Sequence, residues 1–176
     1  MSELEKFVVS KEKVLINYAG GPRWAGLDSK ITYEALAEVG DMNGKTVLDA
    51  GCCRGDLIPF LTPSCLYLGV DINKLTIERA KETYPDHDFS LEDVMEMEKK
   101  FDFVLASSLL GWTYYKHTEM VEKLWDMALD TLAFTCKSVG LEEMTEFCKT
   151  LTDNFTVKKE FSSQEDLFIL RRELAP

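Results

Sequence analysis

The segment KTVLDAGCCRGDL (45–57) contains residue types that can hold a small charged molecule with backbone groups. Gly51 and Gly55 let the backbone turn sharply and approach a ligand that side chains would push away. A helix is expected directly after this loop, and its first turn would offer unpaired N–H groups and the positive end of the helix dipole. Asp49 places a carboxyl group immediately before the loop.

Further polar residues stand where later strands are expected to end. Asp71 closes CLYLGVD, Asp93 lies in LEDVMEM, and Ser107 and Ser108 close FDFVLASS. In open α/β sheets, ligands bind at the carboxyl ends of the strands, near the point where strand order reverses. These side chains are therefore expected to gather near the glycine loop.

From residue 28 onward, the chain alternates short buried strands with amphipathic helices. Helices are expected at 28–40, 56–62, 73–84, 117–130 and 141–153, with a helical turn at 95–100. Strands are expected at 45–50, 65–71, 87–93, 101–108, 131–138, 155–161 and 167–172. This order predicts an α/β fold, with a doubly wound, mostly parallel sheet, one reversed strand near its far edge and helices on both faces.

The length of 176 residues fits one domain spanning the whole chain. Residues 1–27, with the turn AGGPRWAG, are expected to form an N-terminal arm or lid, and 28–176 the core. The sequence contains no run of about 18 apolar residues, so no membrane span is expected. The N-terminus lacks the pattern of a signal peptide.

Charge and cysteine content narrow the class of partner. A net charge of −11 argues against nucleic acid, because backbone phosphates require a basic face. The five cysteines are odd in number and have no zinc-ligand spacing, so no metal is expected. Buried thiols in a reducing cytoplasm are expected, with a reactive Cys52–Cys53 pair as the alternative.

Residues 40–138 resemble the class I S-adenosylmethionine-dependent methyltransferases, of the small stand-alone Rossmann-like type. The first motif of that family is an acid followed by alternating glycines, and it stands here as Asp49-Ala50-Gly51-Cys52-Cys53-Arg54-Gly55. The resemblance implies a seven-stranded sheet of order 3-2-1-4-5-7-6 with strand 7 reversed. It also implies S-adenosyl-L-methionine as methyl donor and S-adenosylhomocysteine as its product.

The resemblance assigns the amino-acid end of the cofactor to the loop residues Asp49, Gly51, Cys52, Cys53 and Gly55. Because Cys53 replaces the middle glycine of the motif, we expect cofactor binding to be weakened but not abolished.

The strand ends receive the remaining roles that the resemblance implies. Asp71 would accept hydrogen bonds from both ribose hydroxyls, with Ile72 packing on the adenine. Asp93 would bind the adenine amino group, with Val94 beside the ring. Ser107 would lie under the methyl-donor site.

Three other interpretations are weighed against this one. A nicotinamide-binding fingerprint needs glycines at 51, 53 and 56, but the last two positions hold Cys53 and Asp56. A non-catalytic or sensory domain that binds S-adenosylmethionine stays open because of Cys53. So does an interaction subunit that keeps only the fold, since fold alone does not give function.

The segment after the fourth expected strand bears on the methyl acceptor. It reads Ala106-Ser107-Ser108-Leu109, where amino-methylating nucleic-acid enzymes carry N/D-P-P-Y, and no Pro-Cys pair offers a nucleophile for a pyrimidine ring. A small-molecule acceptor is therefore expected, and a protein side chain or terminus stays open. The oligomeric state is not indicated.

Aromatic residues in LLGWTYYKHTEM (109–120) are the candidates for a substrate wall, with Trp112 and Tyr115 foremost and core packing as the alternative. Trp24 is a candidate lid residue, or part of a surface turn. Methyl transfer is an in-line displacement, for which positioning does most of the work and a base is needed only where the nucleophile loses a proton. His117 is the candidate base by residue type, with a solvent-facing helix start as the alternative.

Overall fold

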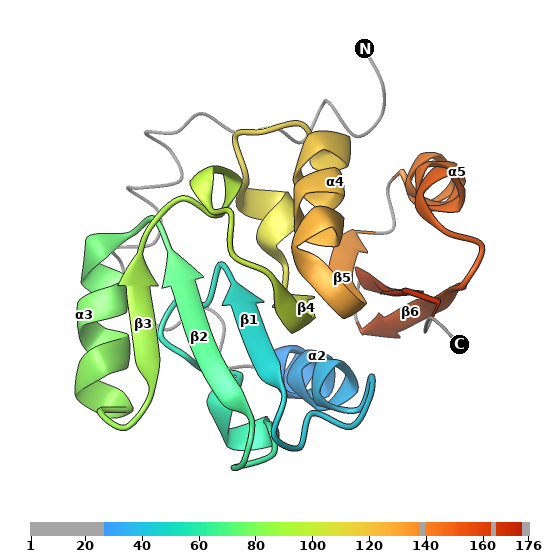
Figure 1. Ribbon diagram of the computed structural model, residues 1–176. Coiled ribbons are helices and arrows are strands. Elements are labelled where there is room, and N and C mark those ends of the chain that lie inside the picture. Colours follow the sequence, from blue (N-terminus) through green and yellow to red (C-terminus); the bar gives the residue numbers. More distant parts are fainter. Residues whose placement is uncertain (1–26, 138–139, 163–164, 174–176) are drawn as a thin grey trace.

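The sheet in the computed structural model has seven strands in the order β3-β2-β1-β4-β5-β7-β6. The structure describes residues 27–137, 140–162 and 165–173 (Figure 1). The strands are β1 (Thr46–Ala50), β2 (Leu66–Asp71), β3 (Asp88–Leu91), β4 (Phe101–Ala106), β5 (Ala128–Lys137), β6 (Phe155–Ser162) and β7 (Glu165–Arg171). β1 to β5 pair in parallel, and β7 runs antiparallel to both β5 and β6. The expected order and the reversed strand are confirmed.

Helices cover both faces of the sheet, as expected for a doubly wound fold (Figure 1). They are α2 (Leu27–Ala37), α3 (Lys74–Thr83), α4 (His117–Met127) and α5 (Leu141–Leu151). Short 3-10 turns form at η3 (Ile58–Phe60), η4 (Val94–Glu96) and η5 (Leu109–Trp112). No helix in the described ranges is long and apolar enough to cross a membrane. The expected N-terminal arm, with Trp24, lies outside the described residues.

Two hydrophobic clusters, one on each face, hold these layers together. Side chains alternate between the faces of a strand, so Val47 packs with α2 and α3 while Leu48 packs with α4 and α5. The same alternation directs Asp49 to the face of α2 and α3 and Ala50 to the opposite face. The face of the sheet on which a β1 side chain lies thus decides whether it packs on the side of α2 and α3 or on the side of α4 and α5.

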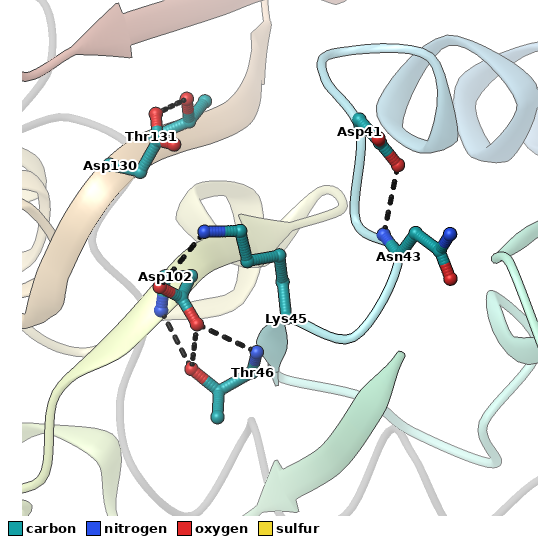
Figure 2. A network of polar contacts seen from close by, with 7 residues as sticks. All are labelled: Asp41, Asn43, Lys45, Thr46, Asp102, Asp130 and Thr131. Carbon is teal, nitrogen blue, oxygen red and sulfur yellow. Dashed lines mark hydrogen bonds and ion pairs between the residues drawn. The ribbon is translucent and has the colours of Figure 1, made fainter. Parts of the chain in front are cut away.

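A polar network at the beginning of β1 fixes its pairing with β4 (Figure 2). The Asp102 carboxylate accepts hydrogen bonds from the Thr46 N–H at 2.8 Å and the Thr46 hydroxyl at 2.7 Å. The Asp102 N–H donates back to Thr46 Oγ1 at 2.8 Å, and the Lys45 ammonium lies 3.9 Å from the carboxylate. These bonds lower the pKa of Asp102. They lock the register of two strands whose opposite ends form the site.

The helix expected at 56–62 is wrong, because only the three-residue turn η3 forms there. Pro59 removes one backbone donor, and Pro63 disfavours helical geometry in the residue before it. The backbone instead makes successive tight turns, in which the Gly55 N–H donates to the Cys52 carbonyl at 2.9 Å and the Ile58 N–H to the Gly55 carbonyl at 3.0 Å. No helix therefore begins directly after the glycine loop.

The boundary between α4 and β5 also differs from the expectation, since β5 begins at Ala128 rather than 131. Arg172 accounts for the early end of the helix. Its guanidinium donates to the Trp125 carbonyl at 2.8 Å and the Ala128 carbonyl at 3.1 Å, and lies 4.0 Å from the centre of the Trp125 indole. An arginine distant in sequence thus caps the carbonyls at the end of α4.

Candidate active site at the carboxyl edge of the sheet

A pocket that opens to solvent, with about 470 Å³ of empty space including its mouth, lies at the carboxyl ends of β1, β2 and β3. The segment between β4 and α4 forms its other wall. Its lining residues are Gly51, Val70, Asp71, Ile72, Glu92, Asp93, Val94, Leu109, Thr113, Tyr114, Tyr115 and Met120. Six of the residues singled out from the sequence therefore meet in one cavity: Gly51, Asp71, Ile72, Asp93, Val94 and Tyr115.

The loop after β1 keeps a left-handed backbone at all three alternating motif positions. The φ angles are +75° at Gly51, +51° at Cys53 and +76° at Gly55. Cys53 adopts this conformation at a cost of roughly 1–2 kcal/mol relative to glycine. A hydrogen bond from the Cys53 N–H to Asp71 Oδ2, at 3.0 Å, stabilises it. The cysteine therefore preserves the turn that the middle glycine makes in the motif.

Asp71, at the end of β2, connects this loop to the next helix. Its Oδ2 accepts the Cys53 N–H, and its Oδ1 accepts the Asn73 N–H at 2.8 Å. Asn73 in turn caps α3, accepting the Leu75 N–H at 3.0 Å. Burial raises the pKa of Asp71, and the bonds from Asn73 and Cys53 oppose that rise. Each carboxylate oxygen keeps a further lone pair, so Asp71 can still accept bonds from a ligand.

Asp93 follows β3 and faces two tyrosines across the pocket. Its Oδ1 accepts the Met95 N–H at 3.1 Å. Its Oδ2 accepts the Tyr115 hydroxyl at 3.0 Å and also the Tyr114 hydroxyl. The two rings lie 4.4 Å apart, centre to centre. Tyr114 belongs to the aromatic stretch that the sequence offers as a substrate wall, and it lines the pocket together with Tyr115.

A second polar group ties the end of β4 to β5 and β7. Ser108 has a left-handed backbone with φ of +54°. Its N–H donates to Thr135 Oγ1 at 2.8 Å, and its hydroxyl donates to Glu165 Oε1 at 2.6 Å. Ser107 is half-buried and does not line the pocket. Glu165 was not singled out from the sequence, because β7 is far from β4 along the chain and β5 lies between the two strands in the sheet.

Comparison with known proteins bears on this arrangement. Residues 47–129 match a family model described as a methyltransferase domain. The putative methyltransferase 235L of Invertebrate iridescent virus 6 is 35% identical over 79 residues, which make up 42% of this chain and 30% of the viral protein. The similarity thus spans less than a third of that relative's length.

Solved structures extend the likeness to nearly the whole chain. Magnesium protoporphyrin IX methyltransferase (ChlM) from Synechocystis PCC 6803, with bound SAM, superposes with a TM-score of 0.67 at 16% identity, covering 98% of both chains. The N-methyltransferase NodS from Bradyrhizobium japonicum WM9, in complex with S-adenosyl-L-homocysteine, gives 0.71 at 14% identity, covering 93% of this chain and 98% of its own. The chain has the class I S-adenosylmethionine-dependent methyltransferase fold.

Within this methyltransferase fold, two motif residues lie behind the glycine loop rather than in the pocket. Asp49 is 3% exposed, and its Oδ2 accepts the Tyr67 hydroxyl at 2.9 Å. Burial raises the pKa of Asp49 to about 7, against an ordinary value of 3.8. Cys52 packs in the same cluster as Tyr67, on the face of α2 and α3.

The vicinal cysteines are held as thiols in the methyltransferase fold. Burial raises the pKa of Cys52 well above its usual range and that of Cys53 to about 12. A thiol must ionise to act as a nucleophile, so the pair has low reactivity near neutral pH. Cys53 and Gly55 shape the loop without lining the pocket.

The structure does not place the candidate base, His117, in the pocket. His117 begins α4, is 4% exposed and does not line the cavity. The alternative of a solvent-facing residue at the start of the helix is wrong, because the His117 side chain is buried. Within the described residues, neither ring nitrogen makes a hydrogen bond. The side chain of Trp112 lies outside what the structure describes.

Acid should therefore destabilise the protein through His117. Burial lowers its pKa below 6.5, only partly offset by the Leu110 backbone and the Glu143 carboxylate. The unfolded chain then binds the proton first, so the contribution of His117 to stability is fully present above pH 6.5 and is lost as the pH falls below that value. His117→Leu should remove this loss, so that between pH 7.5 and pH 5.5 the variant gains on the wild type by at most about 1.4 kcal/mol in urea unfolding. Parallel pH profiles for the two proteins would contradict the assignment.

Proposed function

We propose that this protein transfers the methyl group of S-adenosylmethionine to a small-molecule acceptor. The observation that carries the proposal is the convergence of Asp71 and Asp93, from two strand ends, on one pocket beside a left-handed glycine loop. The pocket offers carboxylate acceptors for hydroxyl and amino groups and apolar contacts from Ile72 and Val94. This combination of hydrogen-bond acceptors and apolar contacts suits an adenosine.

The residues present fit the cofactor in the following way. Asp71 holds the loop through Cys53 and would accept hydrogen bonds from the ribose hydroxyls. Ile72 and Val94 would contact the adenine, and Asp93 would accept a hydrogen bond from its amino group. The backbone around Gly51 would hold the amino-acid end. When bound, S-adenosylmethionine supplies an electrophilic methyl group on a sulfonium, and the chain's main task is to orient an acceptor against it.

The acceptor class rests on charge and on the segment after β4. Similar folds include both the small-molecule enzyme named above and a putative RNA methyltransferase from Pyrococcus horikoshii, so the fold does not choose between acceptors. The net charge of −11 opposes binding to a polyanion. Ala106–Leu109 also lacks the motif that holds an exocyclic base amine. A cytoplasmic setting accords with five free cysteines.

Calorimetric titration of the reduced protein tests the proposal. We expect S-adenosylmethionine and S-adenosylhomocysteine to bind with micromolar dissociation constants and NAD not to bind, because the loop lacks the dinucleotide fingerprint. A folded protein that binds neither sulfur compound would contradict the proposed function. Binding would then justify a screen of small amines, alcohols and thiols for methyl transfer.

A further inference from the structure

The Asp93 carboxylate has an unusually complete set of donors for a group that faces a ligand pocket. Oδ1 receives the Met95 N–H, and Oδ2 receives the hydroxyls of Tyr114 and Tyr115. A carboxylate has about four lone-pair positions, so three donors leave one, on Oδ1. The carboxylate is therefore held in one orientation with a single acceptor position to spare.

The two tyrosines reach this carboxylate from the opposite wall. They are consecutive residues between β4 and α4, whereas Asp93 follows β3, and all three line the pocket. Their rings are tilted by 34° at a centroid distance of 4.4 Å, so both hydroxyls converge on one oxygen. Burial, together with the neighbouring Asp93, raises the pKa of Tyr114, which keeps this phenol a donor.

We infer that Tyr114 and Tyr115 are positioning residues that fix Asp93 as an acceptor-only contact for the purine edge, so that the pocket selects a 6-aminopurine over a 6-oxopurine. The inference rests on the proposed function. An amino group facing the fixed oxygen gains a hydrogen bond. A carbonyl there would set two acceptors against each other, with nothing to compensate for the lost solvation.

The tyrosine hydroxyls matter because a carboxylate with fewer donors could turn away from a carbonyl. A site that hydrogen-bonds one polar group of its ligand rejects an analogue without that group because the polar groups of the site are then left unpaired. The rejection is weaker if those groups can turn to another partner. If the tyrosines merely packed, removing their hydroxyls would lower affinity for both purines alike. The ratio of the two affinities therefore separates positioning from structural support.

The test compares S-adenosylhomocysteine with S-inosylhomocysteine by calorimetry. We expect the wild type to prefer the adenosine compound by at least about a hundredfold. In the double variant Tyr114→Phe/Tyr115→Phe, which keeps both rings, the preference should fall to about tenfold or less. Asp93→Asn should also lose the preference, because an amide can turn a donor toward the carbonyl. Tyr84→Phe, outside the pocket, should keep the wild-type ratio.

Each other outcome overturns the inference. An unchanged ratio in the double variant would make the tyrosines structural only. Equal binding of both compounds by the wild type would show that the pocket does not select a 6-aminopurine, while leaving the proposed function intact. Absence of S-adenosylhomocysteine binding would overturn the proposed function as well. If the double variant fails to fold, Tyr115→Phe alone should still lower the preference severalfold, and an unchanged ratio there would overturn the role of Tyr115.

Discussion

Replacing Asp71 with asparagine should lower the affinity for S-adenosylhomocysteine by at least about a hundredfold, equivalent to about 2.7 kcal/mol. Both carboxylate oxygens accept backbone N–H groups, one from Cys53 in the loop and one from Asn73 before α3. An amide offers one oxygen and one NH₂, so one of these N–H groups would face another donor. In the proposed binding mode, the same change also removes charged acceptors for the ribose hydroxyls, and each such bond would contribute about 1.5–3 kcal/mol.

Calorimetry at constant pH measures this loss, with urea unfolding to show that the variant is folded. Asp86→Asn is the matched control, because it makes the same charge change at an exposed residue after α3. A similar loss in the control would assign the effect to net charge. Unchanged affinity in Asp71→Asn would remove Asp71 from the cofactor site.

Asp49→Asn should stabilise the protein at pH 8 and leave its stability at pH 4 unchanged. The pKa of Asp49 is about 7 in the folded protein, against an ordinary value of 3.8, because the carboxyl group is buried. Between these values, the folded state holds a proton that the unfolded chain has released, so stability falls as the pH rises. The full effect is on the order of 4 kcal/mol.

Asparagine removes this loss because it is neutral at every pH, while its carbonyl oxygen can still accept the Tyr67 hydroxyl. Urea unfolding at pH 4, 6 and 8 should show a variant that gains on the wild type as the pH rises. The change is opposite in sign to that expected for His117, whose effect lies below pH 6.5. A constant difference between variant and wild type across this range would contradict the raised pKa of Asp49.

The pocket was predictable from the sequence where chemistry coincides with strand ends. Asp71 and Asp93 each close a strand expected from the sequence (65–71 and 87–93), and the carboxyl ends of parallel strands meet at one edge of the sheet. Asp49 is different, since it lies inside β1, where alternation with Leu48 turns it to the opposite face. Because Asp49 is adjacent to the glycine loop in the sequence, the motif suggested that both belong to one site. A side chain inside a strand, however, points to the face of the sheet that the alternation of the strand gives it.

Other features depend on contacts between distant segments. Arg172 ends α4 through carbonyls that are 44 and 47 residues away, and no local pattern indicates that bond. The bond between Asp93 and Tyr115 spans 22 residues. The failed helix after the glycine loop had a local signal, because Pro59 and Pro63 both oppose it. The strand–loop–helix pattern predicts a helix there, and the two prolines prevent it.

The position of β7 has a consequence for how the site is made on the ribosome. β7 comes last among the strands but lies between β5 and β6, so neither strand completes its pairing until β7 emerges. The pocket acids Asp71 and Asp93 belong to β2 and to the segment just after β3, and β3 ends at Leu91, 74 residues before β7 begins at Glu165. At about 5–20 residues per second, several seconds of translation separate the two. We expect the part of the pocket built by β1 to β3 to assemble first, and the Ser108–Glu165 contact to form only after β7 has emerged.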